Sequence, residues 1–209
     1  MPASLVPRPG MRLVVGLLAV GVMASSCGSG VGSTPEGFAR FQGEGFSVAH
    51  PPGWTACEIP ARLSPTEADL IQISAPGGDF PPVIEVSNEG RRRRFDHALR
   101  FHRLLLEITP GYRALGESPV EVAGAEQAVR IDFRNRPVLP GVPPVEFRGS
   151  NVLALGRDGD VVSLLVSASA ADYEAMTESI EGIIRSLRVG NEEGGARRTV
   201  PRCKVPGAS

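Results

Sequence analysis

The sequence is poor in aromatic residues, in lysine and in net charge, and each shortage narrows the range of functions. Phe, Trp and Tyr make up 5% of the 209 residues, which is few for the stacked aromatic surfaces that bind single-stranded nucleic acid. Lys204 is the only lysine, and the formal net charge is −1. The chain therefore lacks the positive field that attracts nucleic acid, and we expect no such partner.

The familiar sequence motifs of catalytic and metal sites are also missing. The chain has no Gly-x-Ser-x-Gly, no Cys-x-x-Cys and no His-Glu-x-x-His, which are patterns of hydrolases, redox proteins and zinc enzymes. His97 and His102 are five residues apart in a predicted helix and so lie on different faces, a poor arrangement for sharing a metal. We expect His102, on the apolar face, to be a satisfied buried residue rather than a base. The sequence therefore predicts no catalytic residue, no metal, no cofactor and no enzyme.

Long apolar runs are absent except for one near the start. Residues 13–24 are apolar and follow Arg8 and Arg12. A positive segment followed by about 12 apolar residues is typical of a secretory signal and is too short for a transmembrane helix of about 20 residues. A start at Met11 would give a shorter signal of more usual length. We expect residues 1–26 to be a signal peptide.

Cys27 stands where this apolar run ends. Residues 23–27 resemble the lipobox of bacterial lipoproteins, although Leu or Val is commoner at the position of Ala24 and Gly or Ala at that of Ser26. In such proteins the cysteine sulfur carries a diacylglyceryl group and its amine is acylated, and two or three chains anchor a protein stably. Residues 27–37 then form a Gly/Ser-rich tether. We expect a lipid anchor at the extracytoplasmic face of the cell membrane; the alternative is a secreted protein with a coincidental cysteine.

Cysteine is scarce, and the scarcity limits the disulfide options. If Cys27 carries lipid, only Cys57 and Cys203 remain to pair, and outside the cytoplasm such a pair favours oxidation. The loop of roughly 145 residues would stabilise the fold by about 5 kcal/mol as an upper figure. The alternative is two unpaired thiols with Cys57 buried.

Apolar periodicity predicts the order of the elements. We expect a strand pair within residues 38–50, short strands at residues 68–74 and 83–87, and a helix over residues 93–108. Further strands are expected at residues 120–122, 125–133, 145–148, 151–155 and 161–167, the last of them central. Residues 158–160, an Asp-Gly-Asp sequence, suit a hairpin turn because the other ligands of a calcium loop are missing. A helix over residues 172–187, capped by Ser169 or Ala171, closes the domain.

Four consecutive arginines, Arg91, Arg92, Arg93 and Arg94, form the most concentrated charge in the chain. One interpretation is a contact with an anion, a lipid headgroup or a partner. The other is a solvated junction before the helix, because a helix N-terminus disfavours cations.

Three stretches resemble one known family. Residues 46–54 end in Pro51-Pro52-Gly53-Trp54, residues 124–133 form a strand in the middle, and residues 180–189 end in Ser186-Leu187-Arg188-Val189. Together they resemble the PsbP-like α/β/α sandwich, especially bacterial lipoproteins that carry this domain. The resemblance covers residues 38–189 and leaves residues 190–209 as a flexible tail. It implies an α+β fold, with a mainly antiparallel central sheet flanked by two main helices.

The resemblance implies binding rather than chemistry. Family members of known function are mostly binding and assembly factors, among them a photosystem II extrinsic subunit and a Ran-GTPase partner, and no catalytic residue carries over. We expect a membrane-anchored, non-catalytic module for an envelope protein or an amphiphile. An exposed apolar or arginine-rich patch, with no deep cavity, would favour this interpretation. The alternatives are a carrier of lipid or another hydrophobic ligand, with an apolar cavity, and a cryptic hydrolase, with an Asp/Glu/His cluster in a pocket.

Overall fold

The computed structural model describes residues 30–61, 64, 68, 70–91, 94–137, 144–190 and 200–203. The larger sheet is built from seven strands: β3 (Thr55–Ile59), β4 (Leu70–Ser74), β5 (Val83–Arg91), β6 (Arg113–Pro119), β7 (Ala125–Asn135), β8 (Phe147–Gly156) and β9 (Asp160–Ser169). The smaller sheet is built from β1 (Ala39–Gln42), β2 (Phe46–His50) and β10 (Arg188–Val189). The helices are α1 (Phe95–Glu107), α2 (Ala170–Ala175) and α3 (Thr177–Ser186).

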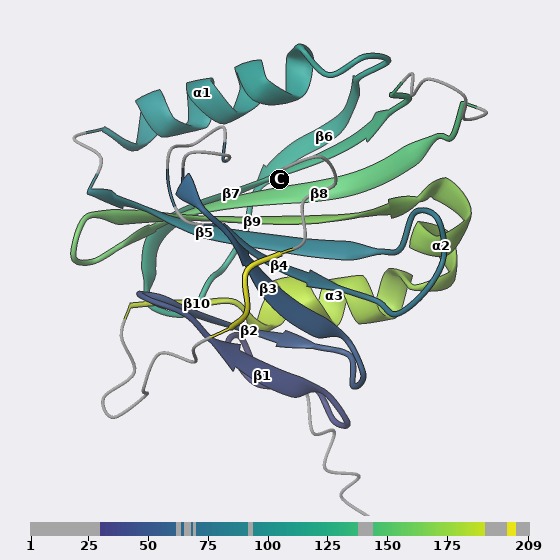
Figure 1. Ribbon diagram of the computed structural model, residues 1–209. Helices are drawn as coiled ribbons and strands as arrows, with labels where there is room; N and C mark the ends of the chain where they lie inside the picture. Colours follow the sequence, from purple (N-terminus) through teal and green to yellow (C-terminus); the bar gives the residue numbers. More distant parts are fainter. Residues whose placement is uncertain are drawn as a thin grey trace, which may run out of the picture.

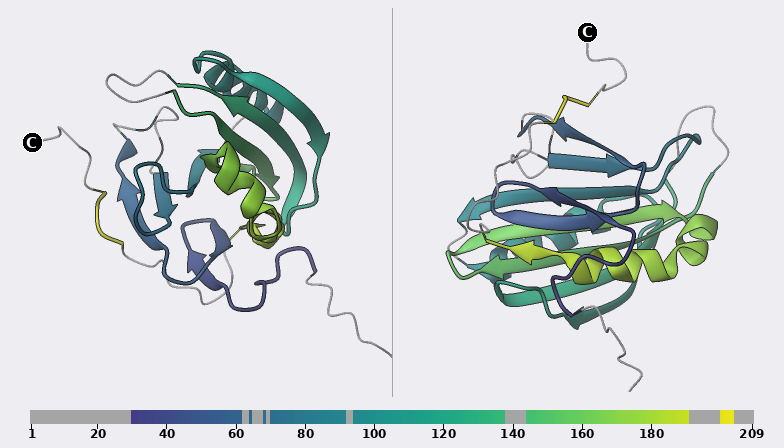
Figure 2. Two further views of the ribbon diagram at one scale, coloured as in Figure 1. Left: turned by 90° about the vertical axis from the view of Figure 1, so that its right-hand side faces the viewer. Right: turned by 90° about the horizontal axis from the view of Figure 1, so that it is seen from below.

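The domain is an α/β/α sandwich around an antiparallel sheet, as the sequence predicts. The strand order in the larger sheet is β3-β4-β5-β9-β8-β7-β6, and every neighbouring pair is antiparallel. Helix α1 covers one face, whereas α2, α3 and the smaller sheet cover the other (Figures 1 and 2). Strand β9 is the fourth of seven, so the most apolar strand is central, also as predicted.

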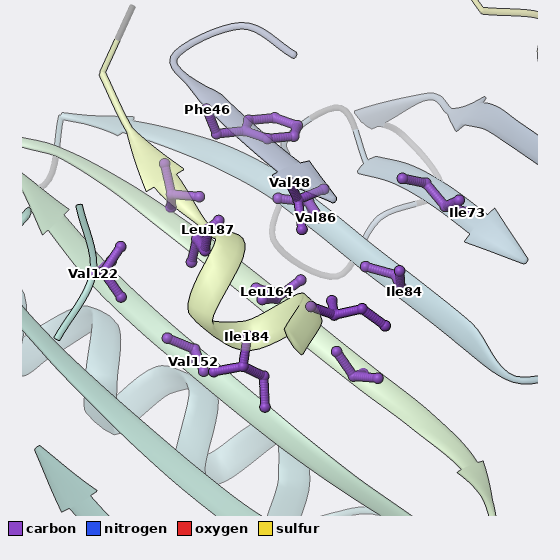
Figure 3. Close-up of a cluster of buried hydrophobic side chains, with 14 of the residues drawn as sticks. Phe46, Val48, Ile73, Ile84, Val86, Val122, Val152, Leu164, Ile184 and Leu187 are labelled. Atoms are coloured by element: carbon purple, nitrogen blue, oxygen red, sulfur yellow. The ribbon is translucent and has the colours of Figure 1, made fainter. Parts of the chain in front are cut away.

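The main core lies between the larger sheet and the layer of α3 and β2 (Figure 3). Ile84, Val152 and Leu164 project into it from β5, β8 and β9 and are fully buried. They meet Ile184 of α3 and Val48 of β2. Because side chains alternate along a strand, the residues between these apolar positions face α1, and several of them are polar.

The two predicted helices are present, and the second is interrupted. Helix α1 lies within the predicted residues 93–108. The closing segment divides into α2 and α3 at Met176, whose φ of −105° and ψ of 11° depart from helical values. The Ser169 hydroxyl caps α2 by accepting a hydrogen bond from the Asp172 amide at 3.2 Å.

Three strand predictions differ from the structure. Residues 120–122 are not a strand; the edge strand of that region is β6, all of whose residues are exposed, so that it carries no apolar alternation. Strand β3 was not predicted, because its residues are at most half-buried. Residues 145–148 and 151–155 were predicted as two strands, but residues 147–148 and 151–155 belong to one long strand, β8, that begins at Phe147. Gly149 and Ser150 between them pair normally with β9.

A disulfide joins Cys57 to Cys203, with a Cα–Cα distance of 4.9 Å. The backbone around it supports the pairing: the Glu58 amide donates to the Pro201 carbonyl, and the Cys203 amide donates to the Glu58 carbonyl, both at 2.9 Å. Residues 200–203 of the predicted tail therefore lie against the outer edge of β3.

The described part of the predicted tether is packed against the domain. The Gly32 amide donates to the Arg185 carbonyl at the end of α3, and the Arg40 guanidinium donates to the Gly32 carbonyl and the Thr34 hydroxyl, all at 2.7 Å. A Cβ on Gly32 would lie 2.5 Å from the Cβ of Ala123, so this contact requires glycine. Cys27, Arg92 and Arg93 lie outside the described residues.

Candidate functional site

A cavity of about 200 Å³ lies between α1 and the larger sheet, and we call it the α1 cavity. It lies beside β4, β5, β8 and β9, each of which contributes at least one lining residue. Its lining residues are Ser64, Leu70, Glu85, Ser87, His102, Leu105, Leu106, Thr109, Asn151, Ser163 and Leu165. The leucines come from β4, β9 and α1, so the walls are largely apolar and the polar groups are few.

A second hollow of about 230 Å³ continues from the α1 cavity along the same face of the sheet. The two share Leu106, Thr109 and Leu165. The second hollow extends to Phe133 and Phe147 on β7 and β8. The space beneath the C-terminal half of α1 is therefore elongated and mostly apolar.

His102 is held at the α1 cavity by two side chains of the sheet. Its Nε2 lies 2.5 Å from the Glu89 carboxylate, whose side chain is 0% exposed. Its Nδ1 lies 3.1 Å from the Asn151 amide nitrogen. Because Asn151 donates there, Nδ1 accepts and the ring proton on Nε2 is donated to Glu89. His102 is therefore a buried, satisfied residue, as predicted.

Two serines of the α1 cavity, Ser87 and Ser163, are not hydrogen-bonded to a base. The hydroxyls of Ser87 and Ser163 lie 2.9 Å apart and bond to each other. A base must hydrogen-bond the hydroxyl that it deprotonates, but both ring nitrogens of His102 are bonded elsewhere. The α1 cavity contains the residue types that a hydrolase would need, but they are not hydrogen-bonded to one another as in a catalytic triad.

Glu85 differs from the other polar residues of the α1 cavity. No hydrogen bond or ion pair joins its carboxylate to any residue that the structure describes. Burial in this apolar setting raises the pKa of the Glu85 carboxyl. The Oδ1 atom of Asn151 is also buried without a partner. Both groups are hydrogen-bond acceptors, so a ligand that carries a hydrogen-bond donor would satisfy them.

The opposite face of the sheet carries a charged network. Arg130 on β7 donates to Asp132 at 2.8 Å, to Glu181 on α3 at 3.0 Å and to Ser150 at 3.1 Å. The Ser150 hydroxyl in turn contacts the Tyr173 hydroxyl at 2.8 Å. A hollow of about 360 Å³ lies beside this network. Arg130 pairs with both carboxylates, so the network ties α3 and, through the Ser150 and Tyr173 hydroxyls, α2 to the sheet.

The solvent-facing side of α1 exposes three apolar residues. Phe101, Leu104 and Ile108 are 37%, 53% and 67% exposed and are spaced three and four residues apart, on one face; we call them the α1 stripe. Leu105, between this stripe and the α1 cavity, is half-buried. Arg100, next to the stripe, makes no ion pair with any described residue. The apolar surface thus runs from the outside of α1 toward the α1 cavity.

The structure places the predicted arginines and cysteines apart. Arg91 ends β5, and Arg94 precedes α1, where its guanidinium lies 3.8 Å from the exposed Asp96 carboxylate. The disulfide lies at the far edge of the sheet on β3. Within the described ranges no group of three or more His, Cys, Asp or Glu side chains is arranged to hold a metal ion.

Comparison with solved structures reveals the fold. The solution structure of cyanobacterial PsbP from Synechocystis aligns over 80% of this chain and 98% of its own length, with a TM-score of 0.52 and 15% identity. The chain has the PsbP-like fold. LpqN of Mycobacterium tuberculosis, described as involved in cell envelope biogenesis, aligns over 75% of this chain and 87% of its own, with a TM-score of 0.49 and 15% identity. A Ran-binding protein of Saccharomyces cerevisiae aligns over 73% and 95%, with a TM-score of 0.46 and 14% identity.

At the level of sequence, comparisons with protein families and with curated proteins find no match. The PsbP-like fold therefore rests on the arrangement of the elements. At this identity it transfers no ligand or partner to the chain.

Sequence reasoning missed Glu85 and Asn151, which line the α1 cavity of this PsbP-like domain, and Glu89, which holds His102. Glu85 stands between Ile84 and Val86 on β5, which suggests an exposed strand face rather than a cavity wall, and Glu89 lies beyond the predicted strand of residues 83–87. Asn151 stood at the end of a predicted strand, with no sign that it meets His102. The usable signal was His102 itself, because a buried histidine on an apolar helix face requires polar partners on the layer beneath it.

Proposed function

We propose that this protein is a lipoprotein anchored through Cys27 at the extracytoplasmic face of the cell membrane, where its domain acts as a non-catalytic binding module for an envelope protein. The observation that carries the proposal is the α1 stripe. A row of large apolar side chains in water is unfavourable for a free monomer and is typical of surfaces that bind other proteins.

The character of the partner follows from the surroundings of the stripe. Phe101, Leu104 and Ile108 supply an apolar centre, and Arg100 supplies a cation beside it that pairs with no described residue. A complementary partner presents apolar side chains flanked by an acidic residue. Arg91 and Arg94 lie toward the N-terminal end of α1 and extend the positive charge on this side of the molecule, so we assign the arginine cluster to the same partner.

The way the chain enters the domain supports this arrangement. The first described residues leave the molecule near β1 and α3, on the side opposite α1 (Figures 1 and 2). Because Gly32 is hydrogen-bonded to the end of α3, few residues separate Cys27 from the domain. An anchor at Cys27 would hold the α3 side toward the bilayer and direct the α1 stripe away from it.

A carrier of lipid or another hydrophobic ligand is the second candidate, and the elongated space beneath α1 favours it. The α1 cavity and the adjoining hollow have about 200 and 230 Å³ and share three lining residues, so together they reach the range of about 300–1,000 Å³ for pockets that hold drug-sized ligands. The main core on the other face of the sheet is solid, with Ile84, Val152 and Leu164 fully buried. The α1 stripe nevertheless favours the surface module, because a carrier does not require a row of apolar side chains exposed on the outside of α1.

The anchor is tested by mass spectrometry of the mature protein extracted from membranes of cells that make it. We expect a diacylglyceryl-modified Cys27 at the N-terminus, and release of a Cys27→Ser variant from the membrane fraction. An unmodified mature N-terminus beyond Cys27 would contradict the proposal. Among the described residues, no helix combines the length and apolarity needed to cross a bilayer.

The binding surface is tested by size-exclusion chromatography of the tagged full-length protein after mild solubilisation. We expect the wild type to elute in a complex and the Leu104→Ser/Ile108→Ser variant to elute as the free protein. Glu178→Ser, an exposed change on α3, is the matched control and should leave the complex intact. A wild-type protein that elutes alone, or a complex that survives the loss of the stripe, would exclude the α1 stripe as the binding surface.

A further inference from the structure

The α1 cavity combines apolar walls with one carboxylate that no described residue neutralises. Leu70, Leu105, Leu106 and Leu165 form the walls, and Glu85 projects from β5 into the space between them. An ionised carboxylate in an apolar setting loses hydration and gains no compensating hydrogen bond. Such a group is stabilised either by taking up a proton or by a cation or a strong donor that reaches it.

We propose that the α1 cavity binds a protonated primary amine carried on a short unbranched hydrocarbon chain. The hydrocarbon lies against the leucines, and the ammonium group donates to the Glu85 carboxylate. This chemistry belongs both to a lysine side chain of a protein and to a free alkylamine. The proposal is independent of the α1 stripe, because none of the three stripe residues lines the α1 cavity.

The other polar groups of the α1 cavity explain why the ligand is a donor and not an acceptor. His102 is bonded to Glu89 and Asn151, the hydroxyls of Ser87 and Ser163 are bonded to each other, and the Thr109 hydroxyl donates to the Leu105 carbonyl at 3.2 Å. The Ser87–Ser163 contact uses one of the two hydroxyl hydrogens, so these residues favour a donor less strongly than Glu85 does. An anionic ligand would meet the like charge of the Glu85 carboxylate, which is unfavourable.

The size of the α1 cavity favours a slender ligand over a bulky one. The α1 cavity has about 200 Å³, less than the range for drug-sized ligands, and Leu105 and Leu106 of α1 line it together with Glu85. A guanidinium or an aromatic ring presents a broad plane, whereas an ammonium on a methylene chain is compact and flexible. The lysine-like group therefore fits better than an arginine-like one.

Titration calorimetry with three probes of equal chain length tests the proposal on the full domain. The probes are n-pentylamine, n-pentanol and pentanoate. We expect pentylamine to bind more tightly than pentanol and pentanoate not to bind. Glu85→Gln keeps the shape of the side chain but removes its charge, and it should weaken pentylamine binding by at least about tenfold. Circular dichroism spectra of the variant establish that it is folded.

Two results would overturn the proposal: pentylamine that binds no better than pentanol, or pentylamine binding that is unchanged in Glu85→Gln. The Leu104→Ser/Ile108→Ser variant should bind pentylamine like the wild type, so that failure of the α1 stripe as a docking surface is distinguished from failure of the amine site. Addition of pentylamine to the complex of the wild-type protein with its partner then identifies the source of the ligand. Dissociation assigns it to a lysine of the partner, and persistence assigns it to a free alkylamine.

Discussion

At the scale of single residues, the buried pair of Glu89 and His102 links the sheet to α1. Their side chains are 0% and 8% exposed, so neither can be hydrated if its partner is removed. We predict that Glu89→Ala lowers the free energy of unfolding by about 3–5 kcal/mol, the usual cost of breaking a buried polar pair. Urea denaturation measures this, with the exposed Glu126→Ala as control. Equal effects of the two substitutions would contradict the assignment.

Glu85 predicts an unusual dependence of stability on pH. Because burial raises the pKa of its carboxyl above the ordinary value of 4.5, the folded state holds the proton more tightly than the unfolded chain. Its contribution to stability is therefore complete below that ordinary value and is lost as the pH rises through the raised pKa. Glutamine does not titrate, so Glu85→Gln should be more stable relative to the wild type at pH 7 than at pH 4. Urea denaturation at both values tests this, and a pH-independent difference would refute it.

The residues of the α1 cavity were only partly predictable from the sequence. His102 was placed correctly as a buried residue because the helical period alone puts it on the apolar face. Three residues that were missed come from β5 (Glu85 and Glu89) and β8 (Asn151). These two strands are neighbours only through β9, and about 60 residues separate them along the chain. A local pattern carries no information about such pairings, and these three residues were therefore missed.

At the scale of elements, the connection between β6 and β7 depends on one glycine. Gly124 has a φ of 81°, and a Cβ there would lie 2.1 Å from the Val189 carbonyl oxygen. We predict that Gly124→Ala lowers the melting temperature far more than Gly53→Ala. Gly53 has a φ of 82° with no atom within 4 Å of its Cβ position, so it isolates the cost of the backbone conformation, about 1–2 kcal/mol. Similar effects at both positions would mean that β10 does not pack against this turn.

Elements with an apolar period were predicted well, and those without one were not. Strand β9 and the two helical segments bury one face or both, so selection for burial leaves a readable pattern. Strand β6 is exposed along its whole length and pairs on one side only. It forms because its backbone pairs with β7, and its own side chains show no pattern from which this pairing could be predicted.

At the scale of the whole molecule, the disulfide closes a loop across the domain. Cys57 and Cys203 are separated by 146 residues along the chain, so the bond restricts the unfolded chain strongly. We predict that Cys57→Ser/Cys203→Ser lowers the free energy of unfolding by about 2–5 kcal/mol without changing the fold. Guanidinium denaturation of the variant and the wild type measures this. Equal stability would show that residues 200–203 contribute nothing to the folded state.

The overall architecture was predicted because the order of helices and strands, together with three short motifs, restricts the topology strongly. The packing of Gly32 onto α3 was not predicted, because a Gly/Ser-rich sequence has the composition of a free linker and its docking depends on Arg40 and Ala123. This contact directs the α1 stripe away from an anchor at Cys27, and the proposed function depends on that orientation.

Site-specific photocrosslinking in intact cells tests the central claim most directly. A photoreactive amino acid replaces Leu104 on the α1 stripe or, as the matched position, the exposed Glu178 on α3. The account predicts that position 104 crosslinks to one discrete envelope protein and that position 178 does not. The absence of any product from position 104, or the same products from both positions, would contradict it.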